Sequence, residues 1–102
     1  MIQVITTIEL RPDCLDRFLV YLGGKVPSVK AERGCLAYEP MVDDDSGLPI
    51  QGELRQNTVT LVEAWANPDA LLAHLKAPHM ASFREGAKDY VQSISYRVLR
   101  TV

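Results

Sequence analysis

The chain has 102 residues, a net charge of −2 and a hydrophobic fraction of 47%, which is typical of one soluble globular domain spanning 1–102. No basic patch stands out, so nucleic acid is not an expected partner. The first residues lack the charged start and long apolar run of a signal peptide, and no apolar stretch approaches the roughly 20 residues that span a bilayer. We therefore expect a cytoplasmic protein with no membrane partner.

The cysteine content argues against a disulfide framework. Cys14 and Cys35 are the only two cysteines, and a cytoplasmic setting keeps such thiols reduced. They form no CxxC motif, so a thiol redox pair is not expected. Both are interpreted as structural or incidental.

The first third of the chain predicts a strand followed by a helix. Apolar residues alternate over 2–10, which is strand periodicity. Pro12 then stands at a favourable first helical position, and apolar residues recur at spacings of three and four to about Lys30. Pro27 either kinks this helix or divides it in two. Gly34 is expected to close the unit in a turn.

The remaining chain predicts three strands and two short helices. On the first of these helices, 68–76, three leucines are expected to face inward: Leu71, Leu72 and Leu75. The segment 43–57 is polar, irregular and long for a connection between strands, which suggests that it covers part of the molecule. The expected strands are 35–42, 58–66 and 93–102, and the expected helices are 68–76 and 78–91.

This order is β-α-β-β-α-β, the ferredoxin-like α+β arrangement, in which helices cover one face of a four-stranded antiparallel sheet. The other face should then carry polar residues at every second position. It does not, since Ile5, Val62, Ala64 and Leu99 interrupt the pattern. Both faces are therefore expected to be covered, and the simplest cover is a second copy. We predict a homodimer that packs sheet against sheet, although another partner could also cover this face.

The stretch 63–83 concentrates side chains that could do chemistry. His74 is either a packed helix histidine or a general base, because imidazole titrates near neutral pH. His79 follows Pro78 at a helix start, where it either caps and packs or accepts a proton. Because a proline separates the two histidines, a shared helical face is not expected.

An aromatic pocket between sheet and helices is the second candidate feature. Trp65 is either core or pocket wall. Glu63, on the same strand face, is either paired with Arg97 or Arg100 or lines a cavity. Other aromatic and apolar side chains either line this pocket or simply pack: Tyr38, Met41, Phe83, Tyr90 and Tyr96.

Several motifs are absent. The chain has no HExxH and no Cys/His cluster, so a metal site is not expected. The run Asp43–Asp45 lacks the glycine and glutamate spacing of a calcium loop and is interpreted as a solvated turn. No GxGxxG, Walker or GxSxG motif points to a nucleotide cofactor or an acyl-enzyme.

The whole chain resembles the antibiotic-biosynthesis monooxygenase domain family of small dimeric α+β barrels, and within it the bacterial quinol monooxygenases. Four segments carry the resemblance in one colinear order: RPDCLDRF (11–18), GCLAYEPMVD (34–43), VTLVEAW (59–65) and HLKAPHMASF (74–83). The second and fourth segments are the most specific. Trp65 and His74 match the aromatic and histidine that family members place in or near the pocket. Tyr38 and His79 fall within the specific motifs.

The resemblance implies oxidation of a quinol or polycyclic phenol by molecular oxygen, without metal, flavin or other cofactor. A small aromatic substrate and oxygen are then the partners, His74 and His79 the catalytic candidates, and Trp65, Tyr38, Glu63, Met41 and Phe83 the substrate-binding candidates. Two alternatives remain, a non-catalytic binder of quinone or flavin-like rings and a structural dimer module. Haem degradation is not expected, because the first strand lacks the asparagine of haem-degrading relatives.

Overall fold

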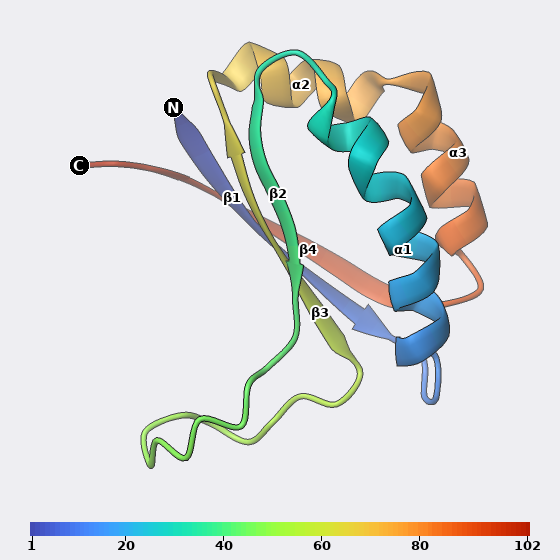
Figure 1. Ribbon diagram of the computed structural model, residues 1–102, viewed down its shortest axis with the longest axis vertical. Coiled ribbons are helices and arrows are strands. Elements are labelled where there is room, and N and C mark those ends of the chain that lie inside the picture. Colours follow the sequence, from blue (N-terminus) through green and yellow to red (C-terminus); the bar gives the residue numbers. More distant parts are fainter.

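The computed structural model describes all residues from 1 to 102 and contains four strands and three helices (Figure 1). The strands form one antiparallel sheet in the order β2-β3-β1-β4. This confirms the ferredoxin-like α+β prediction, with the second helical segment split in two. The elements are β1 (Ile2–Leu10), α1 (Leu15–Lys30), β2 (Cys35–Met41), β3 (Thr58–Trp65), α2 (Pro68–Lys76), α3 (Pro78–Ala87) and β4 (Val91–Arg100).

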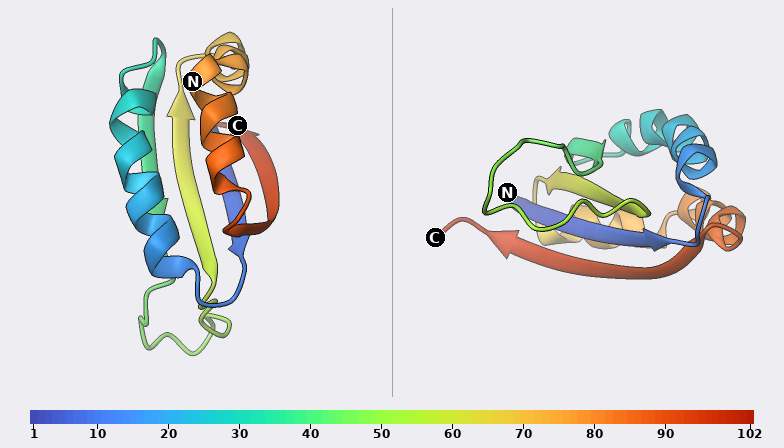
Figure 2. Two further views of the ribbon diagram at one scale, coloured as in Figure 1. Left: turned by 90° about the vertical axis from the view of Figure 1, so that its right-hand side faces the viewer. Right: turned by 90° about the horizontal axis from the view of Figure 1, so that it is seen from below.

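The core lies between the sheet and the helices, which all cover the same face (Figures 1 and 2). Alternate residues of β1 and β3 point into this core, as the strand periodicity predicts. Val4 and Ile8 are buried on β1, and Val59, Leu61 and Trp65 are buried on β3. The helices and the site therefore pack against these two central strands.

Helix α1 begins later than the sequence pattern suggests. Asp13 has a φ of +63°, a left-handed conformation that ends the preceding turn, so the helix starts at Leu15. The prediction that Pro12 is its first residue is wrong. Pro27 lies within one continuous helix and does not divide it, and Phe18 is fully buried on its inner face.

The second helical segment breaks at Ala77, as the following proline predicts. Ala77 has φ −62° and ψ 139°, and it serves both as the C-cap of α2 and as the N-cap of α3. The residue before a proline avoids the helical region, and Pro78 is well suited to the first turn of the next helix. On α2, Leu71 is buried but Leu72 is 50% exposed, so the prediction that Leu72 faces inward is wrong.

A tight turn at Gly34 brings the end of the first helical unit against α2. Gly34 has a φ of +84°, and a Cβ at this position would lie 2.6 Å from the Cβ of Ala70. Its carbonyl accepts a hydrogen bond from the amide of Ala66 at 2.8 Å. The turn therefore holds the residues around Glu32 close to the helices that follow β3.

The helix-free face of the sheet and the strand β4 retain apolar side chains in contact with solvent. Ile5, Val62 and Ala64 are half-buried on this face, and Leu99 is 44% exposed. The segment 42–57 extends beyond the ends of β2 and β3 as a long loop (Figure 1). None of the helices is long and apolar enough to cross a lipid bilayer.

Candidate active site

A cavity of about 220 Å³ lies between the sheet and helices α2 and α3. Most of its wall is apolar, and the polar groups are few, as is usual for sites that bind small organic molecules. The exposed residues of β4 border it on the outer side. Its apolar wall includes Val4, Ile8, Leu61, Leu71, Met80 and Phe83, and its polar wall consists of Thr6, Tyr38, Glu63, His74, Arg84 and Tyr96.

His74 presents a buried imidazole at this cavity. It lies near the end of α2 and is 2% exposed. Its Nδ1 lies 2.7 Å from Oε2 of Glu32, in the turn after α1. The ring packs against Trp65 with centroids 4.6 Å apart and against Tyr38 with centroids 5.8 Å apart. The imidazole is therefore fixed on three sides.

His79 approaches the same carboxylate from α3. Its Nε2 lies 3.4 Å from Oε2 of Glu32, but it is buried and makes no hydrogen bond. The expectation that His74 and His79 do not share a helical face is correct, since Ala77 separates their helices. The structure nevertheless brings both imidazoles to one carboxylate oxygen, and only His74 reaches the cavity wall.

Glu63 is a buried carboxylate on the cavity wall, and each of its two oxygens accepts a hydrogen bond. Oε2 accepts a hydrogen bond from the hydroxyl of Thr6 at 2.8 Å, and Oε1 accepts one from Nε1 of Trp65 at 3.0 Å. Its neighbours across the sheet are Val4 and Tyr38. The alternative of an ion pair with Arg97 or Arg100 is therefore wrong, and the cavity alternative holds.

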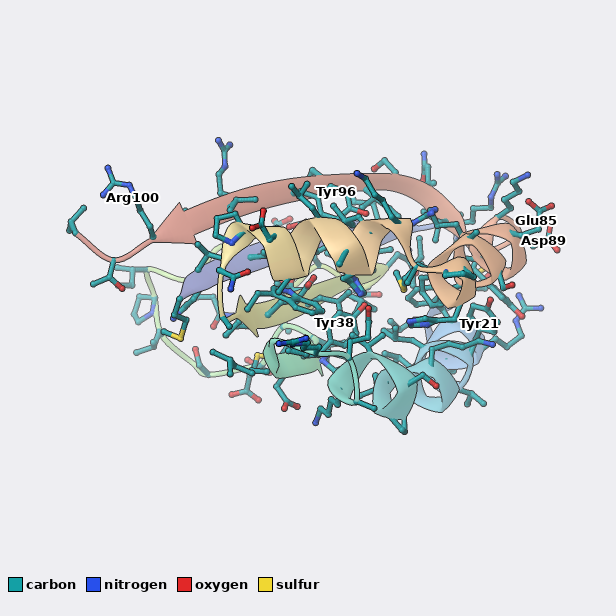
Figure 3. The ribbon with its side chains drawn as sticks, turned by 90° about the horizontal axis from the view of Figure 1, so that it is seen from above. Tyr21, Tyr38, Glu85, Asp89, Tyr96 and Arg100 are labelled. Carbon is teal, nitrogen blue, oxygen red and sulfur yellow. The ribbon has the colours of Figure 1, made fainter.

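Tyr38 is a buried phenol opposite Glu63. Burial raises its pKa well above the usual range, and the negative charge of Glu63 raises it further. Tyr38 therefore stays neutral and can donate a hydrogen bond into the cavity. Burial and Glu63 also raise the pKa of Tyr96, which comes from the opposite edge of the sheet. Figure 3, seen from above, shows the two tyrosines on either side of α2.

Of the other predicted site residues, one lines the cavity and two do not. Phe83 lines the cavity. Trp65 is fully buried and contacts His74 and Glu63, so it supports the wall without forming it. Met41 is 48% exposed at the end of β2 and pairs with Thr60, on the sheet face away from the cavity.

The sequence pattern alone did not single out Glu32, Thr6 or Arg84 as site residues. Thr6 had a visible signal, because it is polar and occupies an inward position of β1 between Val4 and Ile8. Glu32 had none, because its partner His74 is 42 residues away in the sequence. Arg84 reaches the cavity only through the orientation of α3.

The arrangement suits the binding of a planar ring and the movement of one proton. The wall is largely apolar, the imidazole of His74 can accept a proton, and the neutral phenol of Tyr38 can donate a hydrogen bond. No group of three or more His, Cys, Asp or Glu side chains is arranged to hold a metal ion.

Comparison with known proteins shows which family the chain resembles over most of its length. The family model for antibiotic biosynthesis monooxygenases matches residues 1–86. The chain is 34% identical to the Escherichia coli K12 protein YgiN, described as a probable quinol monooxygenase, over 98% of this chain and 97% of that protein.

Solved structures share the fold over nearly the whole chain. The Pseudomonas aeruginosa protein PA3566 has a TM-score of 0.81 at 23% identity, covering 99% of this chain and 93% of its own. Rv0793 from Mycobacterium tuberculosis has a TM-score of 0.79 at 22% identity, covering 99% and 94%. Because the family model matches residues 1–86, well over half of the chain, and the 34% identity to YgiN extends over nearly all of it, the chain belongs to the antibiotic biosynthesis monooxygenase family.

Proposed function

We propose that this protein oxidises a quinol or phenol with molecular oxygen and uses no cofactor to do so. The observation that carries the proposal is an apolar cavity with a fixed imidazole, that of His74, and a neutral phenol donor, that of Tyr38, on its wall. Family membership and the similarity to YgiN support the same class of reaction.

Proton removal is the step that the protein has to promote. A phenol with a pKa near 10 facing a base near 7 is about 3 units uphill, or roughly 4 kcal/mol. An apolar cavity that holds the ring against His74 reduces this cost through orientation and removal of water. The resulting anion is electron-rich enough to give one electron to triplet oxygen directly.

The overall reaction balances without an external reductant. A quinol and one O2 give a hydroxyquinone and one water, so the ring loses four electrons and oxygen gains four. One oxygen atom enters a carbon–hydrogen bond of the ring, and the other leaves as water.

The cavity favours a compact substrate. Its volume of about 220 Å³ is below the roughly 300–1,000 Å³ of sites for drug-sized ligands. A two-ring quinol fits this space better than a larger polycyclic phenol. A quinol dianion would place two negative charges beside the buried Glu63 carboxylate, and like-charge repulsion disfavours two more than one. The reactive form is therefore the monoanion, with its ionised oxygen beside His74.

Oxygen uptake with a reduced naphthoquinol tests the activity. We expect turnover above autoxidation, one labelled oxygen atom in the product from isotopic O2, and loss of turnover in His74→Ala. The matched control is Glu53→Gln, in the exposed loop. Equal rates for the protein and His74→Ala, both at background, would exclude the proposal. Tight binding of the quinone without turnover would favour the ring-binding alternative.

We further propose that the active form is a homodimer in the cytoplasm, where Cys14 and Cys35 stay reduced. Half-buried Ile5 and Val62 and exposed Leu99 support a second copy packed on the helix-free face of the sheet.

Light scattering during size-exclusion chromatography tests the assembly. We expect a mass twice the 11.4 kDa of one chain and a monomer for Val62→Arg. Val20→Arg is the control, because Val20 is 79% exposed on α1, away from this face. A monomeric parent protein would rule out the dimer.

A further inference from the structure

The base in the cavity has a partner that the mechanism above does not use. Oε2 of Glu32 lies 2.7 Å from Nδ1 of His74, within hydrogen-bond distance. The two residues come from separate parts of the fold, the turn after α1 and the end of α2. The tight turn at Gly34 holds these parts together. The contact is therefore built by the tertiary structure and does not arise from local sequence.

The geometry determines which ring nitrogen faces the ligand. A carboxylate oxygen only accepts, so Nδ1 of His74 carries the hydrogen of this bond. In the neutral ring the proton is then absent from Nε2, which lies on the other side of the imidazole. Because His74 lines the cavity, Nε2 is the nitrogen available to take a proton from a bound phenol.

The charge of Glu32 matters at the moment of reaction. When Nε2 accepts a proton, the ring becomes an imidazolium in a site where only 3% of the His74 side chain is exposed. An isolated buried cation is costly, and a carboxylate at 2.7 Å offsets that cost. The side chain of Glu32 is 18% exposed, so it is partly shielded from water and its charge is only partly screened.

The other charged and titratable groups around His74 do not duplicate this role. Tyr38 contacts the ring by its edge and stays neutral. His79 approaches the same Glu32 oxygen but makes no hydrogen bond and does not line the cavity. The remaining groups of this kind on the cavity wall are Glu63, Arg84 and Tyr96.

We propose that Glu32 is the positioning residue of the site, holding His74 with its proton on Nδ1 so that Nε2 acts as the base. His79 is a second neighbour of the Glu32 carboxylate and influences His74 only through that carboxylate. This inference rests on the proposed function for its kinetic consequence, but the state of the imidazole can be measured without any substrate.

Nitrogen NMR of the imidazoles is the first test. In the substrate-free protein, at a pH where the imidazole is neutral, we expect His74 to carry its proton on Nδ1. In Glu32→Leu we expect a mixture of the two tautomers. A His74 ring with its proton on Nε2 in the parent protein would overturn the proposal, whatever the activity of the protein.

Kinetics of Glu32 variants is the second test. Loss of a carboxylate that orients a metal-bound imidazole typically costs 10- to 100-fold, and by analogy we expect a fall of about that size in kcat for Glu32→Gln with little change in KM. The acidic limb of the kcat profile should move to lower pH, because a neutral amide no longer stabilises the imidazolium. Glu32→Asp should recover part of kcat, whereas His79→Ala should change it only a few-fold.

The two failures can be told apart. If the parent protein does not oxidise a quinol but His74 shows the expected tautomer, the proposed function fails and the positioning role stands. If the parent protein turns over and Glu32→Gln has the same kcat and pH profile, the positioning role fails. Thermal unfolding of each variant identifies any that has lost its fold, and Glu53→Gln serves as the carboxylate control.

Discussion

Trp65 donates a hydrogen bond from Nε1 to Oε1 of Glu63, two residues earlier on the same strand, at a distance of 3.0 Å. The hydroxyl of Thr6 occupies the other carboxylate oxygen at 2.8 Å. A buried carboxylate is thus held by two neutral donors without a cation. Both oxygens of this cavity carboxylate are therefore engaged in structural hydrogen bonds, and the indole of Trp65 donates one of them.

This arrangement predicts losses of very different size for two substitutions of Glu63. Glu63→Gln can still accept from Trp65 and donate to Thr6, so we expect a loss of less than about 1 kcal/mol in the free energy of unfolding. Glu63→Leu leaves the indole N–H and the hydroxyl buried without partners, and we expect a loss of about 2–4 kcal/mol. Urea unfolding measures both. Similar losses for the two variants would contradict this account of the carboxylate.

Tyr38 should make the protein sensitive to alkali. Its pKa is raised in the folded state by burial and by Glu63, so the fold favours the protonated phenol. Its stabilising contribution is fully present below the unfolded pKa of about 10 and is lost as pH rises above that value. We expect Tyr38→Phe to lose less stability than the parent protein between pH 9 and 11 in urea unfolding. Parallel curves for the two proteins would contradict this expectation.

Gly34 should tolerate no side chain. Gly34→Ala combines a left-handed backbone with a Cβ placed 2.6 Å from that of Ala70, and we expect a loss of roughly 2–4 kcal/mol. Gly24→Ala is the matched control, because nothing lies within 4 Å of its added Cβ and alanine favours helix by about 1 kcal/mol. The midpoint of thermal unfolding should therefore fall for Gly34→Ala and rise for Gly24→Ala. Adding Ala70→Gly should recover part of the Gly34→Ala loss.

The long loop should respond to acid through one ion pair. Hydrogen bonds from the side chain and then the backbone amide of Arg55 lower the pKa of Asp43 to about 2. The pair's contribution is therefore present above the unfolded value of about 3.9 and is lost as pH falls through about 2. Carbon NMR of the Asp43 carboxyl should show this late titration. A midpoint near 4 would show that the pair does not form in solution.

Periodicity predicted the parts of the fold that hydrophobic burial controls. The inward positions Val4, Ile8, Val59 and Leu61 follow directly from the two-residue repeat of a strand. The break before Pro78 follows from proline geometry. The prediction that Leu72 faces inward was wrong because consecutive helix positions are about 100° apart, so Leu71 and Leu72 cannot both face the sheet.

The site was less accessible from the sequence for a different reason. His74, Tyr38, Glu63 and Phe83 belong to the segments that carry the resemblance, and all four lie on the cavity wall. Which groups hold them depends on contacts between distant segments. The contact between Glu32 and His74 and that between Thr6 and Glu63 join residues 42 and 57 positions apart, and no local pattern encodes them.

The junction at Ala77 sets the spacing of the two imidazoles. A single extended residue separates α2 from α3, so it alone determines how the second helix is rotated relative to the first. Inserting or deleting one residue here would turn the following helix by about 100° and point His79 away from its carboxylate neighbour. Changes in length at this junction are therefore far less tolerable than changes in side chain.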